Sequence, residues 1–181
     1  MPFCGTVSSD DYNTGTKAAA RGGVTTVIDF VIPTREEPLR AAVDCWHGKA
    51  EGKACVDYSF HVCITNPARH IAEIPALIKS GIPTVKEFMI YASQGWQADD
   101  AAIFETLNVV RKHGGMLLVH AESACVLDTL IAQRHNPADM KKYGAKLHTM
   151  TRPHYIESEA IQRAITWAEA TGGRLYIVHM S

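Results

Sequence analysis

Three side chains of types found in metal sites stand near the ends of separate apolar, β-branched runs in this sequence. Lys86 lies in the run 82–89, His120 ends the run 116–120, and His179 lies in the run 174–181. Histidine is a common metal ligand in proteins. Because the carboxyl ends of parallel strands form the ligand-binding face of α/β folds, we expect the three side chains to meet on one rim. The pattern therefore predicts a metal site at the strand ends.

Two further apolar runs carry a polar residue in a comparable place. Asp29 lies in the run 24–30, and His61 lies in the run 56–64. We expect Asp29 to make a structural hydrogen bond at the rim, and His61 to remain in the core or behind the metal ligands. The other histidines fall on expected helices and loops and are interpreted as surface residues: His47, His70, His113, His135, His148 and His154.

Helical patterns alternate with these runs in strict order. The first helix is expected to begin with a capping box of Ser8 and Asp11, and the second with Thr34 and Glu37. Further apolar stripes with helix-start and helix-stop residues predict helices near 66–78, 99–113, 122–134 and 155–170. The longer segment 136–153 separates the last two. This order predicts a parallel sheet with right-handed crossovers.

Two of these helices carry a residue that affects how they form. Pro75 should kink or shorten the third helix, because proline removes a helical hydrogen bond. Glu122 is expected to open the fifth helix, where the helix dipole favours a carboxylate, and no catalytic role is assigned to it.

The length of the chain limits the architecture. With 181 residues and no linker or composition shift, residues 1–181 are expected to form a single domain. Five strands cannot close a barrel, which needs eight strands and roughly 250 residues. The chain is therefore either a small open doubly wound sheet or a piece of a larger barrel.

Composition points to a small-molecule partner. The net charge is -1, and 46% of the residues are hydrophobic, with no basic stripe for nucleic acid and no polybasic segment for a membrane. No apolar run is long enough to cross a bilayer. The five cysteines form no CxxC pair and are interpreted as buried, reduced thiols, which is typical of a cytoplasmic protein.

Several motifs in register carry a family resemblance. They are the segments 1–6, 22–30, 84–91, 119–122, 151–153 and 175–181. Together they resemble the dihydropyrimidinase and hydantoinase branch of the cyclic amidohydrolases over essentially the whole chain. The resemblance implies a metal-dependent (β/α)8 barrel with a small β-sandwich beside it. The implied activity is hydrolysis of the ring amide of dihydropyrimidines or hydantoins, in a homotetramer.

The same resemblance implies roles for individual residues. Lys86 would carry a CO2-derived carbamate that bridges two divalent metal ions, usually zinc. Burial favours the neutral amine, which is the form of lysine that adds CO2. His120 and His179 would be ligands of one metal ion. Tyr91 would donate a hydrogen bond to the oxyanion of the tetrahedral intermediate and contact the substrate. Phe3 and Phe88 correspond to apolar residues around the substrate.

The sequence also departs from the family. The metal-binding His-x-His pair of the first barrel strand does not occur in it, and the catalytic aspartate of the last strand has no counterpart. We therefore interpret the chain as an internal fragment, an incomplete (β/α)8 barrel with strands two to six. By itself it is expected to be inactive. The alternatives are an allantoinase, a dihydroorotase or a non-catalytic scaffold relative, and the joint presence of Lys86, His120 and His179 counts against the scaffold.

Overall fold

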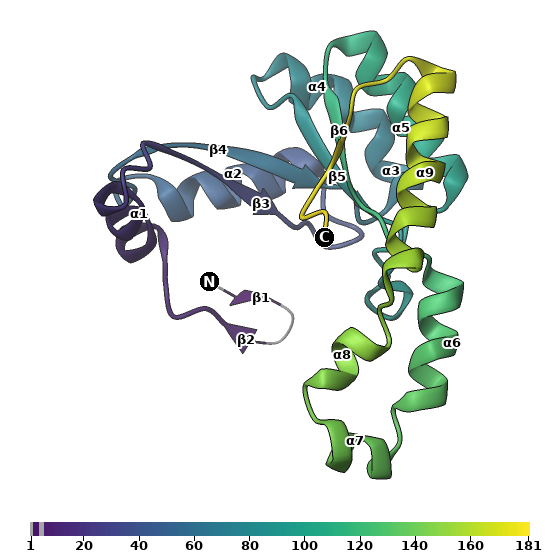
Figure 1. Ribbon diagram of the computed structural model, residues 1–181. Helices are drawn as coiled ribbons and strands as arrows, with labels where there is room; N and C mark the ends of the chain where they lie inside the picture. Colours follow the sequence, from purple (N-terminus) through teal and green to yellow (C-terminus); the bar gives the residue numbers. More distant parts are fainter. Residues whose placement is uncertain (1, 4–5) are drawn as a thin grey trace.

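A computed structural model describes residues 2–3 and 6–181 and contains a five-stranded parallel sheet (Figure 1). Its spatial order is the order of the chain, as expected for successive βα units. The strands are β3 (Thr26–Val31), β4 (Asp57–Cys63), β5 (Thr84–Phe88), β6 (Met116–His120) and β7 (Leu175–Ile177). Within the described residues, β3 and β7 form the two edges of the sheet.

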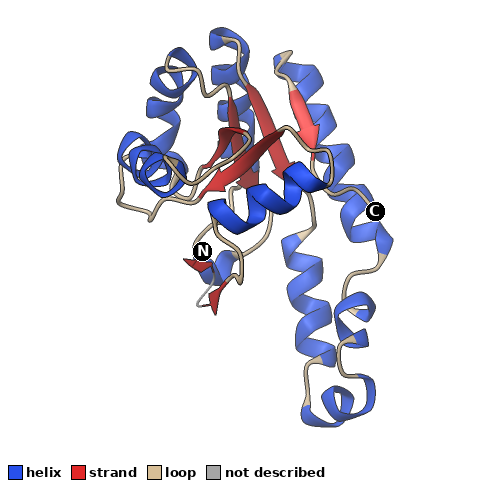
Figure 2. Ribbon diagram, turned by 90° about the vertical axis from the view of Figure 1, so that its left-hand side faces the viewer, coloured by secondary structure: helices blue, strands red, loops and turns tan. Residues whose placement is uncertain are grey.

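Helices connect the strands, and several of them pack around the sheet (Figure 2). Their bounds are α1 (Tyr12–Arg21), α2 (Leu39–Ala50), α3 (Pro67–His70), α4 (Ile74–Lys79), α5 (Asp100–His113), α6 (Ala124–Arg134), α7 (Pro137–Tyr143), α8 (Lys146–Met150) and α9 (His154–Thr171). Helix α2 contacts β3 and β4, α5 contacts β6, and α9 contacts both α5 and β7. In both views α6, α7 and α8 extend away from the sheet as an arm. None of the helices in the described residues is long and apolar enough to cross a membrane.

Side chains of β5 and β6 alternate between the two faces of the sheet, so one face carries the core and the other carries the candidate site. Val85, Leu117 and Val119 are fully buried in the cluster that includes the helices α2, α5 and α9. Side chains of adjacent strand residues point to opposite faces, so Lys86 and Phe88 lie on the other face. Phe88 is paired in register with His120 on β6. The face away from the helices therefore carries the predicted metal-site residues.

One acidic residue, Glu87, is buried on the helix side of β5. The carboxyl group of Glu87 is fully buried and accepts a hydrogen bond from the Thr106 hydroxyl at 2.8 Å, while its second oxygen has no partner. Burial raises the pKa of Glu87 to about 7. The folded protein therefore retains this proton from about pH 4.5 to pH 7, where the unfolded chain releases it, so stability falls as the pH rises through this window.

We expect Glu87→Gln to stabilise the protein at pH 8 but much less at pH 5. The amide keeps an oxygen for the Thr106 hydroxyl and cannot ionise, so the variant avoids a cost of up to about 3 kcal/mol above pH 7. Urea unfolding of both proteins at the two pH values measures the difference. An equal difference at pH 5 and pH 8 would show that Glu87 does not titrate as inferred.

The helix starts differ from the sequence expectation in three places. Helix α1 is capped by Asp11, whose capping-box partner is Thr14, so Ser8 has no part in the box. Helix α2 begins at Leu39, although Glu37 does accept a hydrogen bond from the Thr34 amide in the turn before it. Helix α6 begins at Ala124, so Glu122 precedes the helix. The prediction for Pro75 is confirmed, because α3, a 3-10 turn and α4 replace one long helix.

Two further expectations about burial were wrong, and one local structure was not anticipated. His70 is fully buried, because its ring bonds the Glu37 carbonyl at 3.1 Å and the Asn66 amide at 3.3 Å. Of the described cysteines, Cys63 is buried, whereas Cys45, Cys55 and Cys125 are exposed and free. The two-residue strands β1 (Pro2–Phe3) and β2 (Thr6–Val7) form an antiparallel pair that the sequence did not suggest.

Candidate metal centre

Lys86 is a buried lysine without a carboxylate partner. Its side chain is 3% exposed, and its ammonium donates a hydrogen bond to the Glu87 carbonyl at 3.1 Å. The same nitrogen lies 3.8 Å from the centre of the Phe88 ring. No ion pair among the described residues includes Lys86. Burial lowers the pKa of Lys86 to about 8, which makes the neutral amine accessible near physiological pH.

The structure brings His120 and His179 together. His120 ends β6, His179 follows β7, and their ring centres are 4.5 Å apart. The ring centre of His120 is also 6.2 Å from that of Phe88. The Lys86 ammonium lies over the same Phe88 ring. Burial lowers the pKa of His120, which favours the neutral imidazole that binds metal ions. The expected meeting is therefore present for His120 and His179, whereas Lys86 reaches the Phe88 ring and, among the described residues, forms no hydrogen bond with either histidine.

The donor set fits a metal site only if Lys86 supplies a ligand. The described residues contain no group of three His, Cys, Asp or Glu side chains that could hold a metal ion. Two neighbouring histidines give two nitrogen donors, one fewer than the three protein ligands of a typical catalytic zinc site. A buried lysine with no counter-ion fits the missing place, because a carbamate on its amine would supply oxygen donors and the negative charge.

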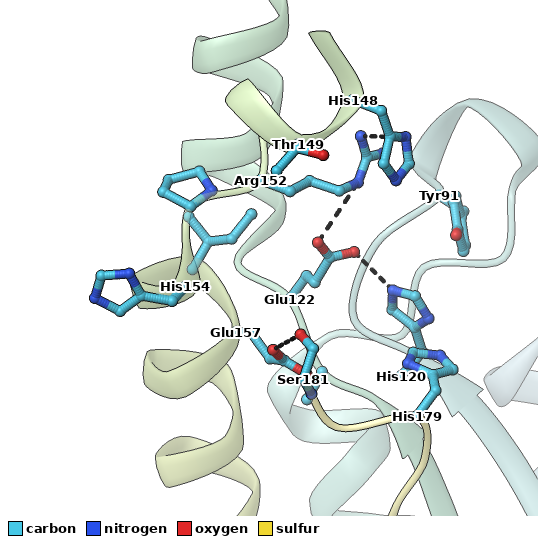
Figure 3. A pocket seen from close by; sticks show the side chains of 13 residues that line it. Tyr91, His120, Glu122, His148, Thr149, Arg152, His154, Glu157, His179 and Ser181 are labelled. Carbon is cyan, nitrogen blue, oxygen red and sulfur yellow. Dashed lines mark hydrogen bonds and ion pairs between the residues drawn. The ribbon is translucent and has the colours of Figure 1, made fainter. Parts of the chain in front are cut away.

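Glu122 and Arg152 belong to this site, although sequence reasoning gave neither a role there. The Nε2–H of His120 donates to Glu122 Oε2 at 2.7 Å, and Arg152 Nε lies 3.5 Å from Glu122 Oε1 (Figure 3). Arg152 also donates to His148 Nδ1 at 3.1 Å. Burial raises the pKa of Glu122, but the His120 hydrogen bond and the Arg152 charge outweigh it and lower the pKa overall. The two-residue spacing of His120 and Glu122 is a signal that could have indicated their contact.

Tyr91 lies beside the histidines in a strained backbone conformation. Its φ is 72°, in the left-handed region that non-glycine residues seldom adopt. Its ring centre is 5.3 Å from His120 and 5.7 Å from Phe88. Strain of this kind costs roughly 1–3 kcal/mol and is concentrated at functional sites. The turn after β5 thus holds Tyr91 at the rim.

These side chains surround a cavity of about 450 Å3 (Figure 3). Tyr91, His120 and His179 line it on one side, and Glu122 and Arg152 line it on the other. The volume is within the range of small-molecule sites. Lys86 and Phe88 lie outside its lining, and the side chain of Phe3 lies outside the described part of the chain.

Asp29 and His61 take positions apart from the histidine pair. Asp29 accepts a hydrogen bond from the Tyr12 hydroxyl at 2.7 Å, which confirms the structural bond expected for it. Among the described residues, no ion pair joins Asp29 to Lys86. His61 is half-buried and bonds the Thr84 hydroxyl at 2.7 Å, at the amino end of β5.

Comparison with known proteins identifies similar chains. No family model matches the sequence. A D-hydantoinase from Geobacillus stearothermophilus is 41% identical over all of this chain, and a dihydropyrimidinase from Dictyostelium discoideum is 37% identical over 99% of it. A crystal structure of a dihydropyrimidinase from Brevibacillus agri superposes with a TM-score of 0.92 at 40% identity, over 100% of this chain and 39% of that one. The chain spans 38% of the Geobacillus protein and 35% of the Dictyostelium protein.

Proposed function

This chain is homologous along its whole length to the D-hydantoinases and dihydropyrimidinases, and we propose that it forms part of the active site of a metal-dependent hydrolase that opens cyclic amides. Its five parallel strands would be strands two to six of a (β/α)8 barrel. Residues 1–181 would be one incomplete barrel domain. The substrates would be dihydropyrimidines or hydantoins, and the products N-carbamoyl amino acids. A homotetrameric assembly and a cytoplasmic location belong to the same proposal.

The observation that carries this proposal is the buried Lys86, which has no ion pair among the described residues and lies over the Phe88 ring that His120 also approaches. A buried ammonium without a counter-ion is costly, so a fold retains one only where it has a use or a partner. The neutral amine of Lys86 can attack CO2: a carbon–nitrogen bond forms, a proton leaves, and a negatively charged carbamate results. Lys86, as a carbamate, would then hold divalent metal ions, zinc in this proposal, together with His120 and His179.

When bound, the metal ions would supply Lewis acidity for the ring carbonyl and lower the pKa of water. The chain's own residues would position the substrate. The hydroxyl of Tyr91, which lines the cavity, would donate a hydrogen bond to the carbonyl oxygen as negative charge develops on it. In the overall reaction, water adds to the carbonyl carbon, the ring carbon–nitrogen bond breaks, and the nitrogen leaves with a proton. Phe88 would pack beneath this region.

The proposal is tested on the whole protein that contains this chain. We expect about two divalent metal ions per subunit and hydrolysis of dihydrouracil or a 5-substituted hydantoin, with loss of activity on chelation and recovery with Zn2+. Purified protein that binds no metal, or that binds metal but opens neither ring, would contradict the proposal.

We expect the 181-residue chain by itself to be inactive. Its sequence provides donors for only part of a two-metal site, because it has no His-x-His pair. The edges β3 and β7 also present unpaired strand groups among the described residues, which favours association. Activity assays and size-exclusion chromatography of the zinc-loaded chain check this prediction. Measurable ring opening by a monomeric chain would be the contrary result.

A further inference from the structure

We infer that Glu122, held by Arg152, is a positioning residue that fixes His120 as the Nε2–H tautomer and leaves its Nδ1 free to bind metal. The inference rests on the proposed function, because it concerns the same metal centre. It adds two residues, from outside the strands, that sequence reasoning did not place there. One of them, Arg152, follows α8 and so belongs to the segment that returns from the helical arm.

The first step is the contact between Glu122 and His120. The distance of 2.7 Å from Nε2 to the carboxylate is that of a strong, charge-assisted hydrogen bond. Both side chains are largely buried, with 12% exposure for His120 and 13% for Glu122, so water competes weakly for the bond. A carboxylate accepts only, and therefore the Nε2 atom of His120 carries the proton. In the neutral imidazole the unprotonated nitrogen is then Nδ1.

The second step is the contact between Arg152 and Glu122. The guanidinium lies 3.5 Å from the Glu122 oxygen that does not bond His120, so each carboxylate oxygen has its own partner. Arg152 in turn donates to His148 on α8. Figure 3 shows Glu122 between Arg152 and His120. This arrangement orients the carboxylate toward His120, which is what a metal-binding histidine requires from a supporting group.

The tautomer can be measured without metal or substrate. In the metal-free whole protein, 15N NMR of histidine-labelled material should show His120 protonated at Nε2, with assignment from a His120→Gln sample. Glu122→Ala should mix the two tautomers, and Glu122→Gln should largely preserve the Nε2–H form, because the amide oxygen still accepts. A His120 that is protonated at Nδ1 in the parent would overturn the inference.

The consequence for metal binding is measured by competition between the protein and a chromophoric chelator for Zn2+. Glu122→Ala should weaken Zn2+ binding roughly 10- to 100-fold, and Arg152→Met should weaken it less. The matched controls are Glu159→Gln and Arg163→Met, which remove a comparable carboxylate–guanidinium pair on α9 with a distance of 3.1 Å. They should bind Zn2+ as the parent does.

The outcomes separate this inference from the proposed function. If the parent binds Zn2+ tightly and Glu122→Ala binds it within about twofold, the positioning role is wrong and the metal centre stands. If the parent binds no Zn2+, the proposed function fails, while the tautomer measurement still decides the contact with Glu122. Should Glu122→Ala not fold, Glu122→Gln replaces it: an Nε2–H tautomer with near-parental affinity supports the inference, and a changed tautomer with unchanged affinity overturns it.

Discussion

Replacing Lys86 with alanine in the whole protein is expected to remove at least one metal ion and nearly all ring-opening activity. The described residues offer two histidines near Lys86 and no third His, Cys, Asp or Glu side chain to complete the site. Without the proposed carbamate, the centre would lose oxygen donors and the negative charge that would offset the metal ions. Because a metal ion contributes several kcal/mol to catalysis, kcat should fall about 10³-fold or more.

Chemical rescue distinguishes a missing ligand from a damaged fold. Small carboxylic acids such as acetate or propionate should enter the space vacated in Lys86→Ala and partly restore both metal content and activity. Lys79→Ala, which removes an exposed lysine at the end of α4, is the control and should change neither quantity. Elemental analysis that finds two ions still bound to Lys86→Ala would reject the bridging role.

The grouping of Lys86, His120 and His179 could be predicted because it depends on a general property of parallel sheets. Lys86 is the central residue of β5, His120 ends β6, and His179 follows β7. These consecutive strands are neighbours in the sheet. Short apolar runs separated by helical stripes indicate this order without further information. The strand bounds differ from the predicted runs by at most four residues and coincide for β6, which does not alter the face on which these side chains lie.

The contact between Arg152 and Glu122 could not be predicted by the same reasoning. Arg152 is thirty positions beyond Glu122, after the segment 136–153, whose path no apolar periodicity determines. That segment folds into the arm helices α7 and α8, and the return of the chain brings Arg152 to the cavity.

The burial of His70 could not be predicted either. His70 was expected at the surface because its helix is short and weakly patterned, yet its ring forms hydrogen bonds with backbone groups in the core.

The backbone conformation at Tyr91 is another feature without a sequence signal. Glycine and asparagine are the usual residues with positive φ, so a tyrosine gives no indication of a left-handed turn. Two backbone hydrogen bonds stabilise the turn: the Tyr91 carbonyl oxygen accepts from the Gln94 and Trp96 amides. These contacts offset the strain and fix the ring next to His120.

Tyr91→Phe is expected to lower kcat roughly 10²-fold, equivalent to about 2.7 kcal/mol of transition-state stabilisation. The substitution keeps the ring, and therefore its contacts with Phe88 and His120, and removes only the hydroxyl. KM should change less than kcat, because the hydrogen bond strengthens as charge develops on the carbonyl oxygen. Metal content and the urea unfolding midpoint should remain those of the parent. Steady-state kinetics at full zinc occupancy measure the effect.

A packing role for Tyr91 gives a different result in the same experiment. If the ring alone matters, Tyr91→Phe retains kcat within about threefold, whereas Tyr91→Ala loses stability through the lost ring contacts. Tyr155→Phe, which removes a hydroxyl from an exposed tyrosine on α9, controls for a general effect of the substitution. A selective loss of kcat in Tyr91→Phe, with unchanged stability, therefore assigns the effect to the hydroxyl, because neither packing nor metal loss would produce it.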